Sequence, residues 1–184
     1  MKIITLETLP KYSVNLGVFI GSFDPIHRGH LELAQKSLKY VDQVLFYPVG
    51  SHIQKTLSPI ESRIKSLQQV ANDSFAVLKL SLGEVTNPGP GWDKVFEILK
   101  ATAPNSMFWL IRGIDKLHSN SYSKPDSLRF KIPHILGVDT CVKTTSNKAN
   151  LIQKLGWFEE VKLVGLQKYG GLSSSRIKQN YETI

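Results

Sequence analysis

Cysteine is the scarcest feature of this sequence, and what the chain lacks excludes several classes of protein. Cys141 is the single cysteine among 184 residues, which excludes an internal disulfide and a cysteine-based zinc cluster. Long apolar runs are also missing, since the run at residues 107–111 is far too short to span a bilayer. Residues 1–16 lack the basic segment, apolar core and cleavage site of a secretory signal. We therefore expect a cytoplasmic protein that has no membrane partner.

Acidic residues are scarce relative to basic ones. The sequence has 23 Lys and Arg against 15 Asp and Glu, a formal net charge of +8. This excess predicts an anionic partner, either nucleic acid or small phosphate-bearing molecules. We favour the small molecules, because no nucleic-acid recognition module and no basic–aromatic run is visible. With 41% hydrophobic and 21% charged residues, we expect one globular domain over residues 1–184.

Short apolar runs alternate with amphipathic segments along the chain, and their spacing predicts the secondary structure. The expected strands cover residues 14–20, 43–47, 75–80, 107–111, 135–142 and 161–166. Helices are expected at 30–40, from Ser58 onward, across 92–99, weakly at 147–155, and at 173–181. Ser58 as the cap, Pro59 in the first turn and Glu61 as the capping-box partner predict the start of the second helix. The alternation predicts an α/β fold with a doubly wound, Rossmann-like parallel sheet, which binds ligands beyond the carboxyl ends of its strands.

The end of the strand at 14–20 carries the most informative segment, because residues 21–30 read GSFDPIHRGH. Gly21 allows a tight turn with room for a ligand, and Gly29 permits close approach of the backbone. His27 and His30 are three apart, so the first turn of a helix aims both rings the same way. A helix N-terminus favours an anion, and two imidazole donors there suit a phosphate that gains charge during transfer. Taken alone, the two histidines also fit an ordinary surface loop or zinc binding, although no third zinc ligand is suggested locally.

The whole segment resembles the Phe-Asp-Pro-x-His-x-Gly-His signature of the nucleotidyltransferase family, most closely its nicotinate and nicotinamide mononucleotide adenylyltransferases. The resemblance implies that His27 and His30 are catalytic, binding phosphates and stabilising the transition state. It also implies a nucleotide-binding role for the turn around them, namely for Gly21, Ser22, Phe23 and Gly29.

A second segment, LSSSRIK at residues 172–178, resembles the closing Ile-Ser-Ser-Thr-x-Ile-Arg motif of the same family. Hydroxyls, open amides and cations at a helix N-terminus form a cradle for a polyphosphate. By itself this pattern also fits an ordinary serine-capped basic helix. Lys178 stands where the family has Arg, which keeps the charge but loses bidentate geometry. The resemblance implies that the phosphates of ATP are held by Ser173, Ser174, Ser175, Arg176 and Lys178.

A third segment, FWLIRGID at residues 108–115, resembles the strand that runs into Gly-x-Asp in pyridine-nucleotide adenylyltransferases. Gly113 and Asp115 fit the adenosine-binding positions of that pattern. Arg112 is instead similar to the Arg-Gly of phosphopantetheine adenylyltransferases. This segment therefore supports the type of reaction and leaves the acceptor open.

The acceptor side is where the resemblance is thinnest. Lys55 lies in a loop like that of the bacterial nicotinate mononucleotide enzymes, which implies a catalytic and substrate-binding role, and Arg63 follows on the next helix. Both side chains are candidates for phosphate contacts, against surface charge as the alternative. Trp92, beside the retained Asp93, is expected either to stack on a pyridine ring or to pack in the core. Tyr122 lies near, but out of register with, another aromatic substrate position of the family.

Taken together, these resemblances imply an enzyme that transfers AMP from ATP to a mononucleotide phosphate and releases pyrophosphate, as a step in NAD biosynthesis. ATP is a substrate and Mg²⁺ bridges its oxygens, with no metal-ligating side chain expected in the protein. Phosphopantetheine adenylyltransferase, a CTP-using cytidylyltransferase and a non-catalytic nucleotide sensor remain open, as does a homo-oligomer. The class I aminoacyl-tRNA synthetases of the same superfamily are excluded by length.

Overall fold

The computed structural model describes residues 1–52, 56–70, 72–80, 86–87, 91–114, 132–139 and 160–166. These residues form three helices and nine strands. The helices are α1 (Arg28–Ser37), α2 (Ile60–Gln68) and α3 (Gly91–Thr102). The strands are β1 (Lys2–Ile4), β2 (Asn15–Gly21), β3 (Gln43–Pro48), β4 (Ser51–His52), β5 (Phe75–Leu78), β6 (Thr86–Asn87), β7 (Met107–Gly113), β8 (His134–Asp139) and β9 (Val161–Leu166).

Seven of the strands form one sheet in the order β1-β5-β3-β2-β7-β8-β9, and every pair in it is parallel. The chain moves outward from β2 through β3 and β5, then returns to the other side of β2 with β7. That reversal between β2 and β7 is the switch point of a doubly wound sheet. The fold is therefore the Rossmann-like α/β architecture that the sequence predicts.

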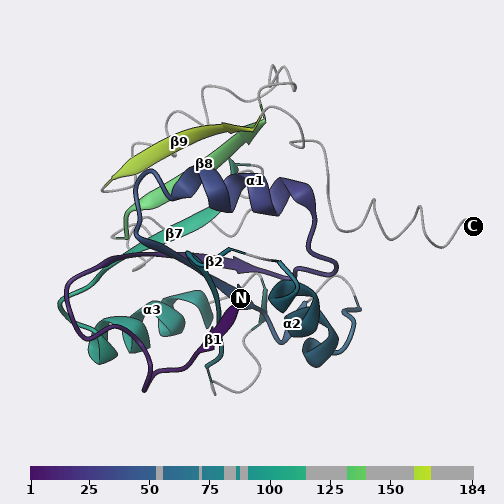
Figure 1. Ribbon diagram of the computed structural model, residues 1–184, viewed down its shortest axis with the longest axis horizontal. Coiled ribbons are helices and arrows are strands. Elements are labelled where there is room, and N and C mark those ends of the chain that lie inside the picture. Colours follow the sequence, from purple (N-terminus) through teal and green to yellow (C-terminus); the bar gives the residue numbers. More distant parts are fainter. Residues whose placement is uncertain are drawn as a thin grey trace, which may run out of the picture.

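Helices cover both faces of the sheet, and α1 and α3 lie on opposite sides of β2 and β7 (Figure 1). Leu33 and Ala34 of α1 and Leu67 of α2 pack on one face, against side chains such as Phe19 and Ile111. The other face is covered by Val95, Phe96 and Leu99 of α3. Because both faces are buried, the central strands are apolar along nearly their whole length, as in β2 and β7.

The last turn of α1 makes polar contacts as well, and one of them reaches the sheet. The Ser37 hydroxyl is fully buried and donates to the Leu33 carbonyl, 2.8 Å away. The Lys36 ammonium donates to the Gly165 carbonyl on β9 and pairs with the Glu32 carboxylate, 2.8 Å away. Of these contacts, the hydrogen bond from Lys36 to Gly165 holds the last turn of α1 against β9. The N-terminus of α1 lies at the carboxyl edge of the sheet because α1 follows β2 directly.

The predicted elements agree with the observed ones within a few residues, with three differences among the described residues. β1 and the short pair β4–β6 were not predicted. The helix expected from Ser58 begins at Ile60, and its N-cap, Pro59, makes no side-chain capping hydrogen bond. Ser58 lies one residue before this N-cap, and its backbone N–H and carbonyl are bonded to Asp24 and Arg63. The helices expected at 147–155 and 173–181 lie outside the described residues. Within the described residues, no helix is long and apolar enough to cross a membrane.

Candidate active site

The sheet opens at its switch point. The pairing of β2 with β7 stops at Phe19 and Ile111, whereas each strand runs on for two residues, to Gly21 and Gly113. Over those residues β2 stays paired with β3, through Gly21 and Pro48, and β7 stays paired with β8, through Gly113 and Gly137. The strands therefore separate at their carboxyl ends, which is where doubly wound sheets bind ligands.

The turn after β2 is shaped by one aromatic ring. Phe23 has a positive φ of 46°, and its side chain is 1% exposed. The ring folds back over Gly21, where an added Cβ would lie 2.9 Å from its Cζ atom. Only glycine leaves room for the ring at this position. The turn continues through a cis peptide bond between Asp24 and Pro25.

His27 and His30 lie side by side at the start of α1. His27 is the N-cap, and the two rings stack with their centroids 3.6 Å apart and their planes 22° apart. This confirms the prediction that the first helical turn aims both rings the same way. Behind them, Phe19 and Phe23 meet the His30 ring edge-on, with centroids 5.7 and 5.1 Å away. The histidine pair is thus backed by the aromatic core.

The protonation of this pair follows from its contacts. The backbone N–H of His27 donates to Nδ1 of the His30 ring, 3.3 Å away. The proton of a neutral His30 ring therefore lies on Nε2. Burial lowers the pKa of His27 to about 4, so His27 is neutral near pH 7. The stacked rings, with His27 neutral, therefore lie beside the positive end of a helix, an arrangement suited to binding a phosphate.

Arg63 does not occupy the place expected of a phosphate ligand. Its side chain is 2% exposed, and it donates from Nη1 to the Ser22 carbonyl at 2.7 Å and from Nε to the Ser58 carbonyl at 2.9 Å. Burial lowers the pKa of Arg63, and the negative charge of Asp24 opposes that shift. Asp24 accepts a hydrogen bond from the Ser58 N–H at 2.9 Å. Arg63 therefore joins the motif turn to α2, a role that its sequence position did not indicate.

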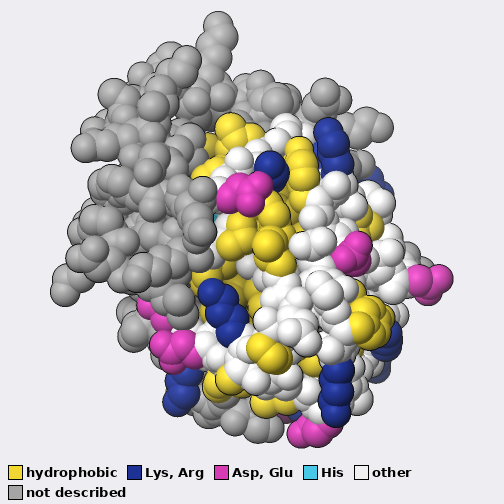
Figure 2. Space-filling view, turned by 90° about the vertical axis from the view of Figure 1, so that its left-hand side faces the viewer, with side chains coloured by type: hydrophobic (Ala, Val, Ile, Leu, Met, Phe, Trp, Pro, Cys, Tyr) yellow, Lys and Arg dark blue, Asp and Glu magenta, His cyan; other side chains and the backbone are white. Residues whose placement is uncertain are grey.

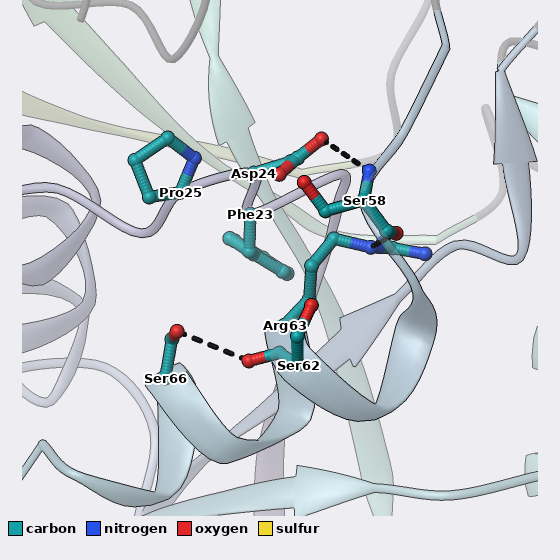
Figure 3. Close-up of a pocket in the computed structure, with 7 residues that line it drawn as sticks. All are labelled: Phe23, Asp24, Pro25, Ser58, Ser62, Arg63 and Ser66. Atoms are coloured by element: carbon teal, nitrogen blue, oxygen red, sulfur yellow. Dashed lines mark hydrogen bonds between the residues drawn. The ribbon is translucent and has the colours of Figure 1, made fainter. Parts of the chain in front are cut away.

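A hollow of about 250 Å³ lies where this turn meets α2 (Figure 3). Ser62 and Ser66 face it from α2, and their hydroxyls donate to the backbone carbonyls of Pro59 and Ser62. Arg63 runs from the helix toward Ser58 along its wall. The hollow is lined by Phe23, Asp24, Pro25, Ser58, Ser62, Arg63 and Ser66.

Arg112 and His134 lie buried near the carboxyl end of β7. Leu110 pairs with His134 in the register, so Arg112, two residues after Leu110, shares their face of the sheet. Arg112 is 3% exposed, and its positive charge acts on His134. The arginine of the Arg-Gly dipeptide, Arg112, is therefore enclosed by the protein rather than exposed on its surface.

Comparison with known proteins places this chain in a family. The family model described as cytidylyltransferase-like matches residues 18–180, which includes the carboxyl ends of both strands of the switch point and the histidine pair. The chain belongs to the cytidylyltransferase-like family. This agrees with the nucleotidyltransferase resemblance of the motifs at residues 21–30 and 172–178.

Relatives of this cytidylyltransferase-like chain carry one recurrent name. It is 34% identical over 130 residues to the "Probable nicotinate-nucleotide adenylyltransferase" of Saccharopolyspora erythraea, covering 67% of this chain and 60% of that protein. It is 33% identical over 105 residues to the protein of the same name from Methylacidiphilum infernorum, covering 54% and 52%. The chain therefore spans between half and two thirds of the length of these curated relatives.

A solved structure confirms the fold. It is titled Plasmodium falciparum nicotinic acid mononucleotide adenylyltransferase complexed with NaAD, and it superposes with a TM-score of 0.69 at 18% identity. The superposition covers 90% of this chain and 83% of that one. At this identity the likeness establishes the shared Rossmann-like architecture.

The structure describes part of the predicted site of this family member. It brings together Gly21, Ser22, Phe23, Gly29 and the histidine pair at the carboxyl edge, with Gly113 across the opening. Trp92 lies in the first turn of α3, and its side chain is outside the described residues. Also outside them are Lys55, Asp115, Tyr122, Ser173, Ser174, Ser175, Arg176 and Lys178.

The surface charge of the described part is scattered. On the face in Figure 2, the described basic side chains stand apart from one another, with acidic side chains and apolar surface between them. No described group of three or more His, Cys, Asp or Glu residues is arranged to hold a metal ion.

Proposed function

We propose that this chain is a nicotinate-nucleotide adenylyltransferase, which transfers AMP from ATP to the phosphate of nicotinate mononucleotide and releases pyrophosphate. The observation that carries the proposal is the stacked histidine pair at the opening of β2 and β7, in a family member whose relatives share that name. The reaction completes the dinucleotide in NAD biosynthesis, and we expect it to take place in the cytoplasm.

The chemistry is a direct displacement at phosphorus. A phosphate oxygen of the mononucleotide attacks the α-phosphorus of ATP and forms the new P–O bond. The bond from the α-phosphorus to the oxygen bridging it to the β-phosphorus breaks, and that oxygen leaves with pyrophosphate. Negative charge spreads over the phosphoryl oxygens in the transition state, so positioning and charge stabilisation supply most of the rate enhancement.

The geometry of the histidine pair supports a role in that stabilisation. Nε2–H of His30 is a fixed donor, because Nδ1 of the same ring accepts a hydrogen bond from the backbone N–H of His27. His27 is neutral near pH 7, since burial lowers its pKa to about 4, and so it also donates without charge repulsion between the stacked rings. Donors fixed before the reaction need no reorganisation as charge develops, which is the source of their effect on rate.

The remaining groups act on the two ends of ATP and on the acceptor. Gly113 and Asp115 bind adenosine, and the segment from Ser173 to Lys178 holds the β- and γ-phosphates. Mg²⁺, carried by those phosphates, neutralises part of their charge. Lys55 contacts acceptor phosphate, while Trp92 and Tyr122 contact the pyridine nucleotide. These assignments rest on the resemblance of the motifs.

The acceptor is tested by supplying purified protein with ATP, Mg²⁺ and one of several acceptors, and by measuring pyrophosphate release. We expect release with nicotinate mononucleotide and less with nicotinamide mononucleotide. Preference for phosphopantetheine, or for CTP over ATP, would reassign the chain within its family. Tight ATP binding with no release for any acceptor would refute the enzyme and favour a nucleotide sensor.

A variant tests the role of His30 in this reaction. We expect His30→Ala to lower kcat about 100- to 1,000-fold, as does removal of one fixed donor to a developing oxyanion in other enzymes. Circular dichroism and the melting temperature should show that the variant is folded. A folded His30→Ala protein with nearly normal kcat would contradict the catalytic assignment.

A further inference from the structure

Arg63 and Asp24 connect two segments that flank the histidine site. Arg63 reaches 41 residues back in the sequence to the Ser22 carbonyl, and it also holds the Ser58 carbonyl just before α2. Asp24 accepts from the N–H of the same Ser58. Two hydrogen bonds thus join the turn at residues 22–24 to the start of α2, and a third holds the Arg63 side chain to Ser58, beside the hollow in Figure 3.

The connection between β3 and α2 is fastened to this turn at both ends. At its start the Val49 N–H donates to the Gly21 carbonyl, 3.0 Å away. At its end Ser58 is held by Asp24 and Arg63. The turn is therefore supported from both sides, and the Arg63 side chain contacts both Ser22 and Ser58.

The position of this turn determines what lies behind the two histidine rings. Phe23 follows Ser22 directly, and its ring contacts His30 edge-on with centroids 5.1 Å apart. Moving the Ser22 carbonyl moves the peptide that sets the unusual φ of Phe23, and with it the ring behind His30. His27 in turn stacks on His30. A shift of the turn is thus transmitted through Phe23 to the two donors.

We propose that Arg63 is a positioning residue, which fixes the spacing and orientation of the histidine pair by holding the Ser22 and Ser58 carbonyls together. This rests on the proposed function for its kinetic consequence, while the geometry of the rings is independent of it. Lysine can supply one point contact where arginine supplies a planar fork with two separate donors. Methionine supplies none and leaves two carbonyls without their donor.

The test compares Arg63→Met, Arg63→Lys and the control Lys65→Met, which removes an exposed cation from the same helix. Each variant is assayed for kcat, for the KM values of ATP and acceptor, and for melting temperature. The ring nitrogens of His27 and His30 are followed by ¹⁵N NMR in the absence of substrate. We expect Arg63→Met to lower kcat on the order of 100-fold at temperatures where it is folded, because small displacements of catalytic groups have such effects.

The remaining variants sharpen that expectation. Arg63→Lys should recover part of kcat, and Lys65→Met should match the wild type. The ring-nitrogen signals should shift in Arg63→Met, shift less in Arg63→Lys, and stay unchanged in Lys65→Met. Both KM values should change much less than kcat, since the turn acts on the reacting groups more than on substrate binding.

Failure of this proposal is distinguishable from failure of the proposed function. If the wild type releases no pyrophosphate with any acceptor, the function is wrong, and the ring signals still decide the role of Arg63. A folded Arg63→Met protein with unchanged ring signals, or with unchanged kcat in an active enzyme, overturns the proposal. Should Arg63→Met fail to fold, Arg63→Lys decides: shifted ring signals support the role, and unshifted signals refute it.

Discussion

His134 should make this protein sensitive to acid. The side chain on β8 is 0% exposed, and in the neutral ring Nδ1–H donates to the Ile132 carbonyl, 2.6 Å away. Burial and then the positive charge of Arg112 lower the pKa of His134 to about 3, against an opposing effect of the Ile132 hydrogen bond. The folded protein therefore keeps this ring neutral under conditions in which an exposed histidine is charged.

The sign of the effect follows from where the proton binds. In the unfolded chain His134 titrates near its ordinary pKa of about 6.5. As the pH falls below that value, His134 binds a proton in the unfolded state, whereas in the folded state it stays neutral until about pH 3. The free energy of unfolding therefore decreases. Between about pH 7 and pH 5, this one residue lowers the free energy of unfolding by about 2 kcal/mol, at 1.36 kcal/mol per unit of pKa difference. That figure holds wherever the folded pKa lies well below 5.

The assay compares urea unfolding of the wild type and His134→Asn at these two pH values. Asparagine offers an amide N–H toward the Ile132 carbonyl but does not titrate. We expect the free energy of unfolding of the wild type to fall by about 2 kcal/mol more than that of the variant over this range. His27 titrates in both proteins, so its contribution cancels. Equal losses in the two proteins would refute the reasoning, as would an NMR titration of His134 near pH 6.5 in the folded state.

Two further predictions concern the site. Gly21→Ala places a Cβ 2.9 Å from Cζ of Phe23, and we expect a loss of about 1–3 kcal/mol in urea unfolding, together with lower turnover. A variant as stable and as active as the wild type would show that the ring moves aside freely. Trp92→Ala should raise the KM of the acceptor more than that of ATP if the ring stacks on the pyridine. Equal changes in the two KM values would instead identify a packing role.

The sequence predicted the central strands well because they are buried on both faces. Such strands carry continuous apolar runs, as in β2 and β7, and these runs are visible without knowledge of their neighbours. β1 was missed for the opposite reason. It is three residues long and buries only Ile4, so neither an apolar run nor an alternation marks it.

The start of α2 shows how tertiary contacts override a local signal. Ser58, Pro59 and Glu61 form a good capping pattern, yet the helix begins at Ile60. The backbone of Ser58 is engaged by Asp24 and Arg63, and this holds Ser58 outside the helix. The sequence left Arg63 open between a phosphate contact and surface charge, and the structure shows neither, since its side chain is buried against two backbone carbonyls. Its partner Ser22 is 41 residues away, and no local pattern reveals a bond from a side chain to a distant carbonyl.

The histidine pair was predicted from the sequence in both identity and mutual orientation, whereas its setting had to come from the fold. Gly21 and Gly113 are 92 residues apart, and either glycine alone is an ordinary strand end. They face each other because the chain reverses at β2 and places β7 beside it, and because the pairing of these two strands stops at Phe19 and Ile111. The opening thus arises from strand order, which carries the two motifs to one edge. β9 also runs parallel to these strands and ends at the same edge of the sheet.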